Sequence, residues 1–271
     1  MSKKCNHPGF FRRLVAKLQF LGVGFSDFII NFGVFITKIG GVLKFEHFWS
    51  HYIGKDEDVQ IVPSFNRSKS KHQIWDIALQ CVQKLGTSGQ ILEFGTNNGG
   101  SLKYFWSKLS KDYILRGFDT FQGIPEPWDS LPKGAIKGYG FPSELWGNDI
   151  TELKKIEDEV TRSGNIPKPP QENIIIDKGL FAHSVPRLLE KGVPDDIRLI
   201  HFDADIYMGT RPVLDTICGQ ISYKYYILFD ELYSVNHEFK AWTEFVDFFE
   251  VNKWKVIAAS EDGVQVLIEV N

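Results

Sequence analysis

The chain has few cysteines, and their positions suit neither cross-links nor metal binding. Three occur among 271 residues, Cys5, Cys81 and Cys218, with no C-x-x-C spacing. An odd and scattered set of this kind indicates neither a disulfide framework nor a structural zinc site. We therefore expect a protein of a reducing compartment, the cytoplasm.

An excess of positive charge is also missing. The 31 basic and 34 acidic residues give a formal net charge of -3, whereas nucleic-acid-binding domains present a basic surface and have a high isoelectric point. Composition therefore argues against a nucleic-acid partner.

Long uninterrupted hydrophobic runs are missing too, even in the apolar segment from Leu14 to Leu43. Lys17, Asp27, Asn31 and Lys38 interrupt it, and a helix needs about 18 consecutive apolar residues to span a bilayer. We expect neither a signal peptide nor a transmembrane helix here. The segment fits helices that pack as a lid or as the interface of a homo-oligomer; an interfacial membrane contact is the alternative.

A polar, charged stretch from Gly54 to Gln73 follows this segment. Its composition is typical of a connection between folded parts. We therefore expect two parts: residues 1–67, a helical extension with its linker, and residues 68–271, the main domain.

The main domain has a regular alternation of helix-like and strand-like apolar patterns. Its strand-like runs include QILEF, YILRGFD, ENIIIDKG, IRLIHFD and KYYILFD. Continuous apolar runs suit strands that are covered on both faces, so the order predicts an α/β fold with a doubly wound, mostly parallel sheet. Near the C-terminus, KWKVIAAS and VQVLIEV are separated only by EDG, which predicts a closing antiparallel hairpin.

The first of these strands leads into a glycine-rich turn, ILEFGTNNGGS, at residues 91–101. Its spacing, Glu93-x-Gly95-x-x-x-Gly99, is not the G-x-G-x-x-G fingerprint of dinucleotide sites. Glycines let the backbone pass close to a ligand, and Glu93 offers an acceptor for a cationic amine. Asp119 ends the next strand, where doubly wound folds place an acid against a ribose. The pattern predicts a nucleoside-bearing cofactor; a plain turn with a buried, hydrogen-bonded acid is the alternative.

Four carboxylates follow two later strands. HFDADIY places Asp203 and Asp205 at one strand end, and ILFDELY places Asp230 and Glu231 at the other. If the strands are neighbours, these acids repel one another unless a cation neutralises them, and Mg²⁺ takes such oxygen ligands. The alternative is that some of them, Asp205 in particular, precede and cap helices. His201 lies on the same strand, where a single histidine is more often a core residue.

These blocks, in this order, resemble the macrocin O-methyltransferase (TylF-type) family of class I S-adenosylmethionine-dependent methyltransferases. The resemblance covers residues 71–271 and depends on LEFGTNNGGS, GFDTFQGIPEPW, DKGLFAHSVP, IHFDADIYMGTRPVLD and ILFDELY. It implies a Rossmann-like, seven-stranded methyltransferase sheet, S-adenosylmethionine as methyl donor and a divalent cation such as Mg²⁺. It also implies a small hydroxylated acceptor, often a sugar or a glycosylated natural product.

The resemblance also implies roles for individual residues. Glu93, Gly95 and Gly99 would flank the methionine part of the cofactor and Asp119 its ribose. The remaining predicted cofactor contacts are Thr96, Asn97, Ser101 and Asp177. The metal ligands would be Asp203, Asp230 and Glu231, and either Asp203 or Asp205 would be the catalytic base. The chain departs from the family in its Asp-Glu pair at 230–231, where two aspartates are more common.

The segment from Gly123 to Asp149 is rich in proline, glycine and aromatic residues and is long for a connection. Such segments are often lids over a binding site. Two other functions remain open from the sequence: an NAD-dependent, sugar-modifying oxidoreductase, and a non-catalytic relative that binds S-adenosylmethionine.

Overall fold

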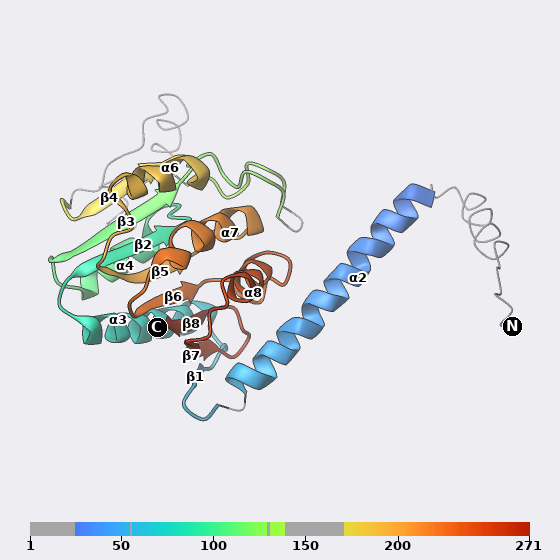
Figure 1. Ribbon diagram of the computed structural model, residues 1–271, viewed down its shortest axis with the longest axis horizontal. Coiled ribbons are helices and arrows are strands. Elements are labelled where there is room, and N and C mark those ends of the chain that lie inside the picture. The colour runs from blue at the N-terminus through green and yellow to red at the C-terminus, as the bar shows by residue number, and fades with distance from the viewer. Residues whose placement is uncertain (1–24, 55, 129–130, 139–170) are drawn as a thin grey trace, which may run out of the picture. The chain divides into compact units, whose positions relative to one another are not determined.

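The computed structural model describes residues 25–54, 56–128, 131–138 and 171–271 (Figure 1). The chain divides into two compact units, residues 1–46 and 47–271. Most of helix α2 (Phe25–Phe48) belongs to the first unit. One face of α2 carries exposed apolar side chains at Phe32, Ile36, Ile39 and Leu43. Within the described ranges, no helix is both long and apolar enough to cross a membrane.

The second unit is built on one mixed sheet. In the described part of the chain this sheet has eight strands in the order β1-β7-β8-β6-β5-β2-β3-β4 (Figure 1). All neighbours pair in parallel except β8, which is antiparallel to β6 and β7. The strands are β1 (Gln60–Val62), β2 (Gly89–Phe94), β3 (Tyr113–Asp119), β4 (Ile174–Lys178), β5 (Ile197–Phe202), β6 (Tyr225–Phe229), β7 (Trp254–Ser260) and β8 (Val266–Val270).

The mostly parallel sheet and its C-terminal hairpin confirm the predicted fold class, with one strand more than the seven expected. The additional strand, β1, lies within the stretch predicted to be a linker and pairs in parallel with β7, Ile61 beside Ala259. The strand is only three residues long, the first of them Gln60, and it follows a charged stretch, so its pattern alone did not reveal a strand.

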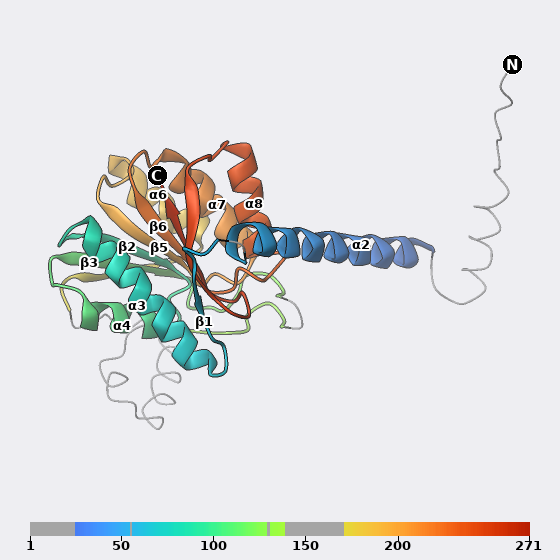
Figure 2. The ribbon, with the colours of Figure 1, turned by 90° about the horizontal axis from the view of Figure 1, so that it is seen from below.

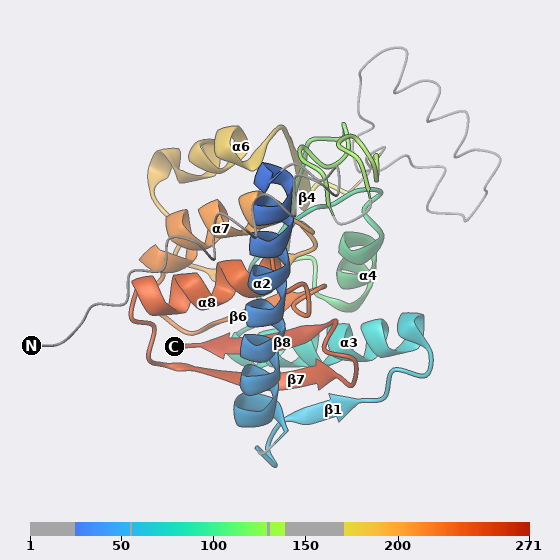
Figure 3. The same cartoon turned by 90° about the vertical axis from the view of Figure 1, so that its right-hand side faces the viewer.

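Helices cover both faces of the sheet (Figures 2 and 3). One layer holds α3 and α4, and the opposite layer holds α6, α7 and α8. The helices are α3 (Arg67–Leu85), α4 (Gly100–Lys108), α6 (Phe181–Leu188), α7 (Tyr207–Thr216) and α8 (Glu238–Phe248), with short turns η1 (Trp49–Ile53), η3 (Leu189–Lys191) and η4 (Cys218–Gln220). The two layers of helices bury both faces of the central strands, as their continuous apolar runs require.

A row of four phenylalanines fixes the strand ends on the α6–α8 face. Phe118, Phe94, Phe202 and Phe229 lie side by side on β3, β2, β5 and β6. All four are fully buried, and successive ring centroids are 4.7, 5.7 and 5.3 Å apart. Such aromatic contacts contribute roughly 0.5–1.5 kcal/mol each beyond area burial. Four neighbouring strands therefore end at one level, and the residues that follow them emerge together.

Helix α3 begins close to this edge. The side chain of Asn66 caps it by accepting a hydrogen bond from the Lys69 amide at 3.0 Å, an arrangement typical of helix N-termini. Its buried face includes Ile74, Trp75 and Ala78. The first turns of α3 can therefore place side chains near the carboxyl ends of the strands, from the face of the sheet that α3 and α4 cover.

Candidate functional site

The backbone ladder continues for one residue beyond the phenylalanine row. The amides of Gly95, Asp203 and Asp230 donate to the carbonyls of Phe118, Phe94 and Phe202 at 2.9, 2.9 and 2.8 Å. The glycine turn and both acid pairs are therefore held at a single edge, as the sequence predicted from parallel strand ends.

The glycine turn lies directly against the loop that carries Asp203. Gly95 has a φ of +98°, and a Cβ added there would lie 1.8 Å from the carbonyl oxygen of Asp203. Gly99, with a φ of +69°, precedes α4. Glycine at position 95 is thus required by the close approach of two backbone segments, in addition to any ligand.

Asp119 ties the ends of β2 and β3 together. Its Oδ2 accepts from the Asn97 amide at 2.8 Å, and its Oδ1 accepts from the Phe121 amide at 2.7 Å. Burial outweighs these hydrogen bonds and raises the pKa of Asp119. Since a carboxylate has about four acceptor positions, Asp119 retains capacity for ligand hydroxyls.

A cavity of about 330 Å³ opens at this edge. It lies by the ends of β2, β3 and β5. This is the point where the strand order of a doubly wound sheet reverses, and ligands commonly bind there. The described lining residues are Gly95, Asn97, Asp119, Thr120, Gly123, Ile124, Pro125, Glu126, Ile136, Leu180, Phe181, Ala182, Asp203, Ala204, Asp205, Ile206, Met208 and Gly209. The cavity thus brings together five predicted site residues: Gly95, Asn97, Asp119, Asp203 and Asp205.

The described part of the segment predicted to be a lid contributes to this lining through Gly123, Ile124, Pro125, Glu126 and Ile136. Residues 139–149 of that segment lie outside the described residues.

Glu93 is not in the cavity lining but lies beneath it, fully buried. Its Oε1 accepts from the Ser101 hydroxyl and lies 2.9 Å from Nδ1 of His201. Since a carboxylate accepts, this contact places a proton on Nδ1 and fixes the orientation of the ring. In this structure Glu93 therefore holds His201, and Ser101 holds Glu93; the sequence predicted that both Glu93 and Ser101 contact the cofactor.

Three other residues predicted to contact the cofactor are also outside the described lining. Thr96 is buried, and Gly99 is the residue just before α4. Asp177 on β4 pairs with Arg116 on β3, whose Nη2 lies 3.1 Å from its Oδ1. The structure thus assigns Asp177 to an ion pair between adjacent strands.

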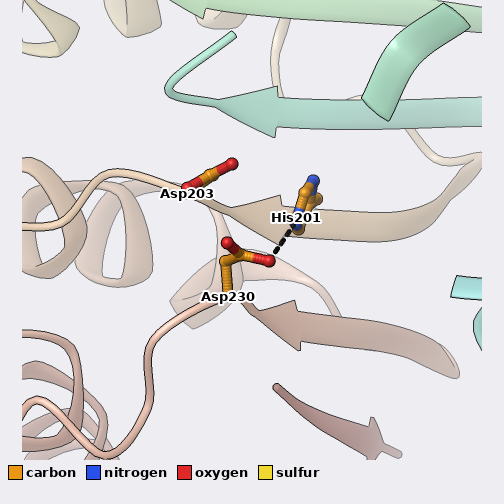
Figure 4. Close-up of side chains that lie close together, drawn as sticks. All are labelled: His201, Asp203 and Asp230. Atoms are coloured by element: carbon orange, nitrogen blue, oxygen red, sulfur yellow. Dashed lines mark ion pairs between the residues drawn. The ribbon is translucent and has the colours of Figure 1, made fainter. Parts of the chain in front are cut away.

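His201, Asp203 and Asp230 form a compact group beside the cavity (Figure 4). Each can offer one ligand atom such that all three atoms lie within 4.8 Å of one another. Nε2 of His201 and Oδ1 of Asp230 are 3.9 Å apart. Both atoms are buried, and neither has a hydrogen-bond partner among the described residues.

Two basic side chains from α3 approach the acids, and neither was among the site residues predicted from the sequence. Nζ of Lys71 lies 2.7 Å from Oδ2 of Asp230 and 3.7 Å from Oδ2 of Asp203. Arg67 lies 3.5 Å from Glu231. A signal was present in the sequence, because Lys71 precedes Ile74, Trp75 and Ala78 at the spacing of one helix face. A lysine on an otherwise buried face needs an anionic partner.

These charges shift the acids in opposite directions. Although burial favours the neutral form, His201 and Lys71 lower the pKa of Asp230 to about 2. Burial and the neighbouring Asp230 raise the pKa of Asp203 well above its usual range. Burial, with Glu231 and Asp230 nearby, raises the pKa of Asp205 to about 7. Asp205 also has a φ of +63°, a left-handed conformation that non-glycine residues rarely adopt.

Glu231 is turned toward other partners. Its carboxylate faces Arg67, and its amide donates to Oε2 of the buried Glu238 at 3.2 Å. The group that can share one cation therefore contains His201 in place of the predicted Glu231.

The donor set fits a divalent cation. One imidazole nitrogen and two carboxylate oxygens converge, and two of these buried atoms lack hydrogen bonds among the described residues. Glu93 on the far nitrogen of His201 is the outer partner that metal-binding histidines commonly have. No ion is part of the structure, so the fit concerns the residues alone.

Known proteins share this fold. Comparison with family models and with curated sequences gave no match. The structure is similar to that of CalS11, described as a calicheamicin methyltransferase, with a TM-score of 0.50 and 19% identity over 84% of this chain and 91% of that one. An apo structure of CalS11, described as a TDP-rhamnose 3'-O-methyltransferase, gives 0.47 and 18% over 84% and 92%. The O-methyltransferase NovP gives 0.47 and 17% over 72% and 78%.

At these identities the likeness establishes the fold alone, a Rossmann-like α/β fold shared with CalS11. The resemblance to the macrocin O-methyltransferase family stays a prediction.

Proposed function

We propose that this protein is an S-adenosylmethionine-dependent O-methyltransferase that acts on a hydroxyl of a small acceptor, a sugar or a glycosylated natural product. One observation carries the proposal: Asp119, suited to a ribose, and the Asp203–Asp205 pair, suited to a reacting hydroxyl, line the same cavity. The calicheamicin methyltransferase with the same fold supports the choice of chemistry and of acceptor class.

The cofactor would lie over the glycine turn. Asp119 would accept hydrogen bonds from the ribose hydroxyls, as acids at this position do in doubly wound folds. The side-chain oxygen of Asn97, which also belongs to the lining, is buried without a hydrogen-bond partner among the described residues. Such an orphan acceptor suits a ligand amine or hydroxyl. Gly95, held against Asp203, brings the cofactor loop next to the acidic loop.

Asp205 is the residue we assign as the proton acceptor. It lines the cavity, and a carboxyl group held within hydrogen-bond reach of a hydroxyl can accept its proton. Its left-handed backbone conformation turns the chain away from the direction of β5, which ends three residues earlier. Asp205 would take the hydroxyl proton as the acceptor oxygen bonds to the methyl carbon and the bond between that carbon and the sulfonium sulfur breaks, which leaves S-adenosylhomocysteine.

His201, Asp203 and Asp230 would hold the divalent cation, whose chemistry is to bind the acceptor oxygen and acidify its hydroxyl. Asp203 belongs to both the cation group and the cavity lining, so it links the two parts of the site. Fixing the acceptor there would align its oxygen for in-line transfer.

The test has two steps. S-adenosylhomocysteine should raise the melting temperature and NADH should not; the reverse would indicate an oxidoreductase. A panel of sugars and glycosylated compounds is then incubated with methyl-labelled S-adenosylmethionine, with Mg²⁺ or with EDTA. We expect label transfer that EDTA abolishes. Transfer unaffected by EDTA would contradict the metal assignment, and an S-adenosylhomocysteine-binding protein inactive on every acceptor would indicate a non-catalytic relative.

We also propose a cytoplasmic location and a homo-oligomeric state. For the N-terminal segment we propose a packing surface, with an interfacial membrane contact as the alternative.

A further inference from the structure

Lys71 occupies a position that a metal site does not explain. Its ammonium contacts Asp203 and Asp230, two members of the candidate cation group, at 3.7 and 2.7 Å. The same ammonium lies 5.1 Å from the ring centroid of Trp75, one turn along α3. A permanent positive charge is thus already placed on the oxygens that would bind a divalent cation.

Carboxyl groups outnumber basic groups around Lys71. Six interact here, those of Glu93, Asp203, Asp205, Asp230, Glu231 and Glu238. The basic partners that approach them are Lys71, Arg67 and His201. Burial offsets part of this excess, because it raises the pKa of Asp203 and of Glu238 well above the usual range and so favours their protonated forms. Lys71 therefore pairs with only part of the acidic group.

The side chain of Lys71 is suited to move. Lysine carries a compact charge on a flexible chain, and its contact with Asp230 is a single hydrogen bond and not a paired fork. About a quarter of the side chain is exposed, 27%, so the ammonium has a route to water. The face of Trp75 offers it a second favourable contact.

We infer that Lys71 is a built-in counter-ion that competes with a divalent cation for Asp203 and Asp230 and is displaced when the cation binds. The inference rests on the proposed function, because that function supplies the cation. An ammonium and a divalent ion that share two oxygens repel each other strongly in a partly buried site. Lys71 therefore weakens cation binding, and it keeps the acids paired when no cation is bound.

The direct test is calorimetric titration with Mg²⁺ on the full chain. Lys71→Met should bind Mg²⁺ roughly ten- to a hundredfold more tightly than the unaltered protein, because one repulsive charge is gone. Lys71→Arg keeps the charge and should bind no more tightly than the unaltered protein. The matched control is Lys69→Met, which removes the same charge from an exposed position on α3. Unchanged or weaker binding by Lys71→Met would overturn the inference, as would failure of every variant to bind Mg²⁺.

A second measurement uses the unaltered protein and does not depend on the folding of Lys71→Met. Movement of the ammonium away from Asp230 changes its position relative to Trp75 and should change tryptophan emission as Mg²⁺ is added, and Trp75→Phe should lose this change. Equal responses with and without Trp75 would contradict displacement. Binding of S-adenosylhomocysteine, measured on the same samples, separates the two ideas: normal binding without competition refutes only the role of Lys71, whereas no binding refutes the methyltransferase proposal itself.

Discussion

Replacing Gly95 by alanine should lower the free energy of unfolding of this protein and weaken its proposed cofactor binding. Gly95 links the glycine turn to the loop after β5, and an added Cβ would lie 1.8 Å from the carbonyl oxygen of Asp203. No side-chain rotation can relieve this clash, because both partners are backbone or directly attached to it. The two loops must separate, and both belong to the cavity lining.

The magnitude follows from two costs. A left-handed backbone conformation disfavours a Cβ by roughly 1–2 kcal/mol, and forcing extra volume into a closely packed site costs roughly 1–3 kcal/mol. Gly95→Ala should therefore lower the free energy of unfolding by about 2–5 kcal/mol. Affinity for S-adenosylhomocysteine should fall as well, because the close contact between Gly95 and the loop of Asp203, two segments that line the cavity, is lost.

Urea denaturation followed by circular dichroism, together with calorimetric titration of S-adenosylhomocysteine, measures both effects. Gly100→Ala is the matched control: Gly100 begins α4, and a Cβ there would meet nothing within 4 Å. That variant should keep its ligand affinity and gain up to about 1 kcal/mol, because alanine favours helix more than glycine does. If Gly95→Ala were as stable as Gly100→Ala and bound the ligand equally well, the close approach of the two loops would be wrong.

Three further predictions address other parts of the molecule. Asp205→Asn should reduce kcat in the labelled-methyl assay by about 10²–10⁴-fold while leaving S-adenosylhomocysteine affinity nearly unchanged; full activity would remove Asp205 as the base. Asp119→Ala should weaken S-adenosylhomocysteine binding at least about tenfold, because a charge-assisted hydrogen bond is lost, and calorimetry would expose an unchanged affinity. Glu269, 2.8 Å from Lys224, has a lowered pKa because its partners, Lys224 first, outweigh burial. The pair therefore stabilises the fold above the usual carboxyl pKa of 4.5 and loses this effect as the pH falls below it. Glu269→Gln should thus be less stable than the unaltered protein at pH 7, and the difference should shrink in acid; a constant difference in thermal melts would contradict this.

The fold could be predicted because its signals are local. Apolar periodicity identified the central strands, and the three-residue EDG connection identified the hairpin that β7 and β8 form. Parallel strand ends meet at one edge, so the proximity of Asp119, Asp203 and Asp230 also followed from the sequence. The structure confirms this edge and adds the phenylalanine row that holds it level.

The partners of individual side chains could not be predicted, because they depend on packing between distant segments. Lys71 and Asp230 are 159 positions apart, and His201 and Glu93 are 108 apart. The sequence predicted that a metal ion neutralises the acids. The structure adds a second cation, the ammonium of Lys71, which contacts Asp203 and Asp230. His201 is fully buried, as expected of a histidine on a core strand, but its position between Glu93 and Asp230 depends on packing that the sequence does not show.

The short strand β1 has a consequence for how the domain could be shortened. It covers the last three residues of the outer edge of β7, with Val62 buried and its carbonyl accepting from the Glu261 amide at 2.8 Å. A chain that began at residue 68 would retain every described cavity residue, yet it would leave this end of β7 without its outer neighbour. Uncovered strand edges invite pairing between molecules, and a very short edge strand such as β1 offers little to pair with. We therefore regard β1 as protection against aggregation, and such a truncated protein would be an active-site scaffold prone to self-association through its sheet.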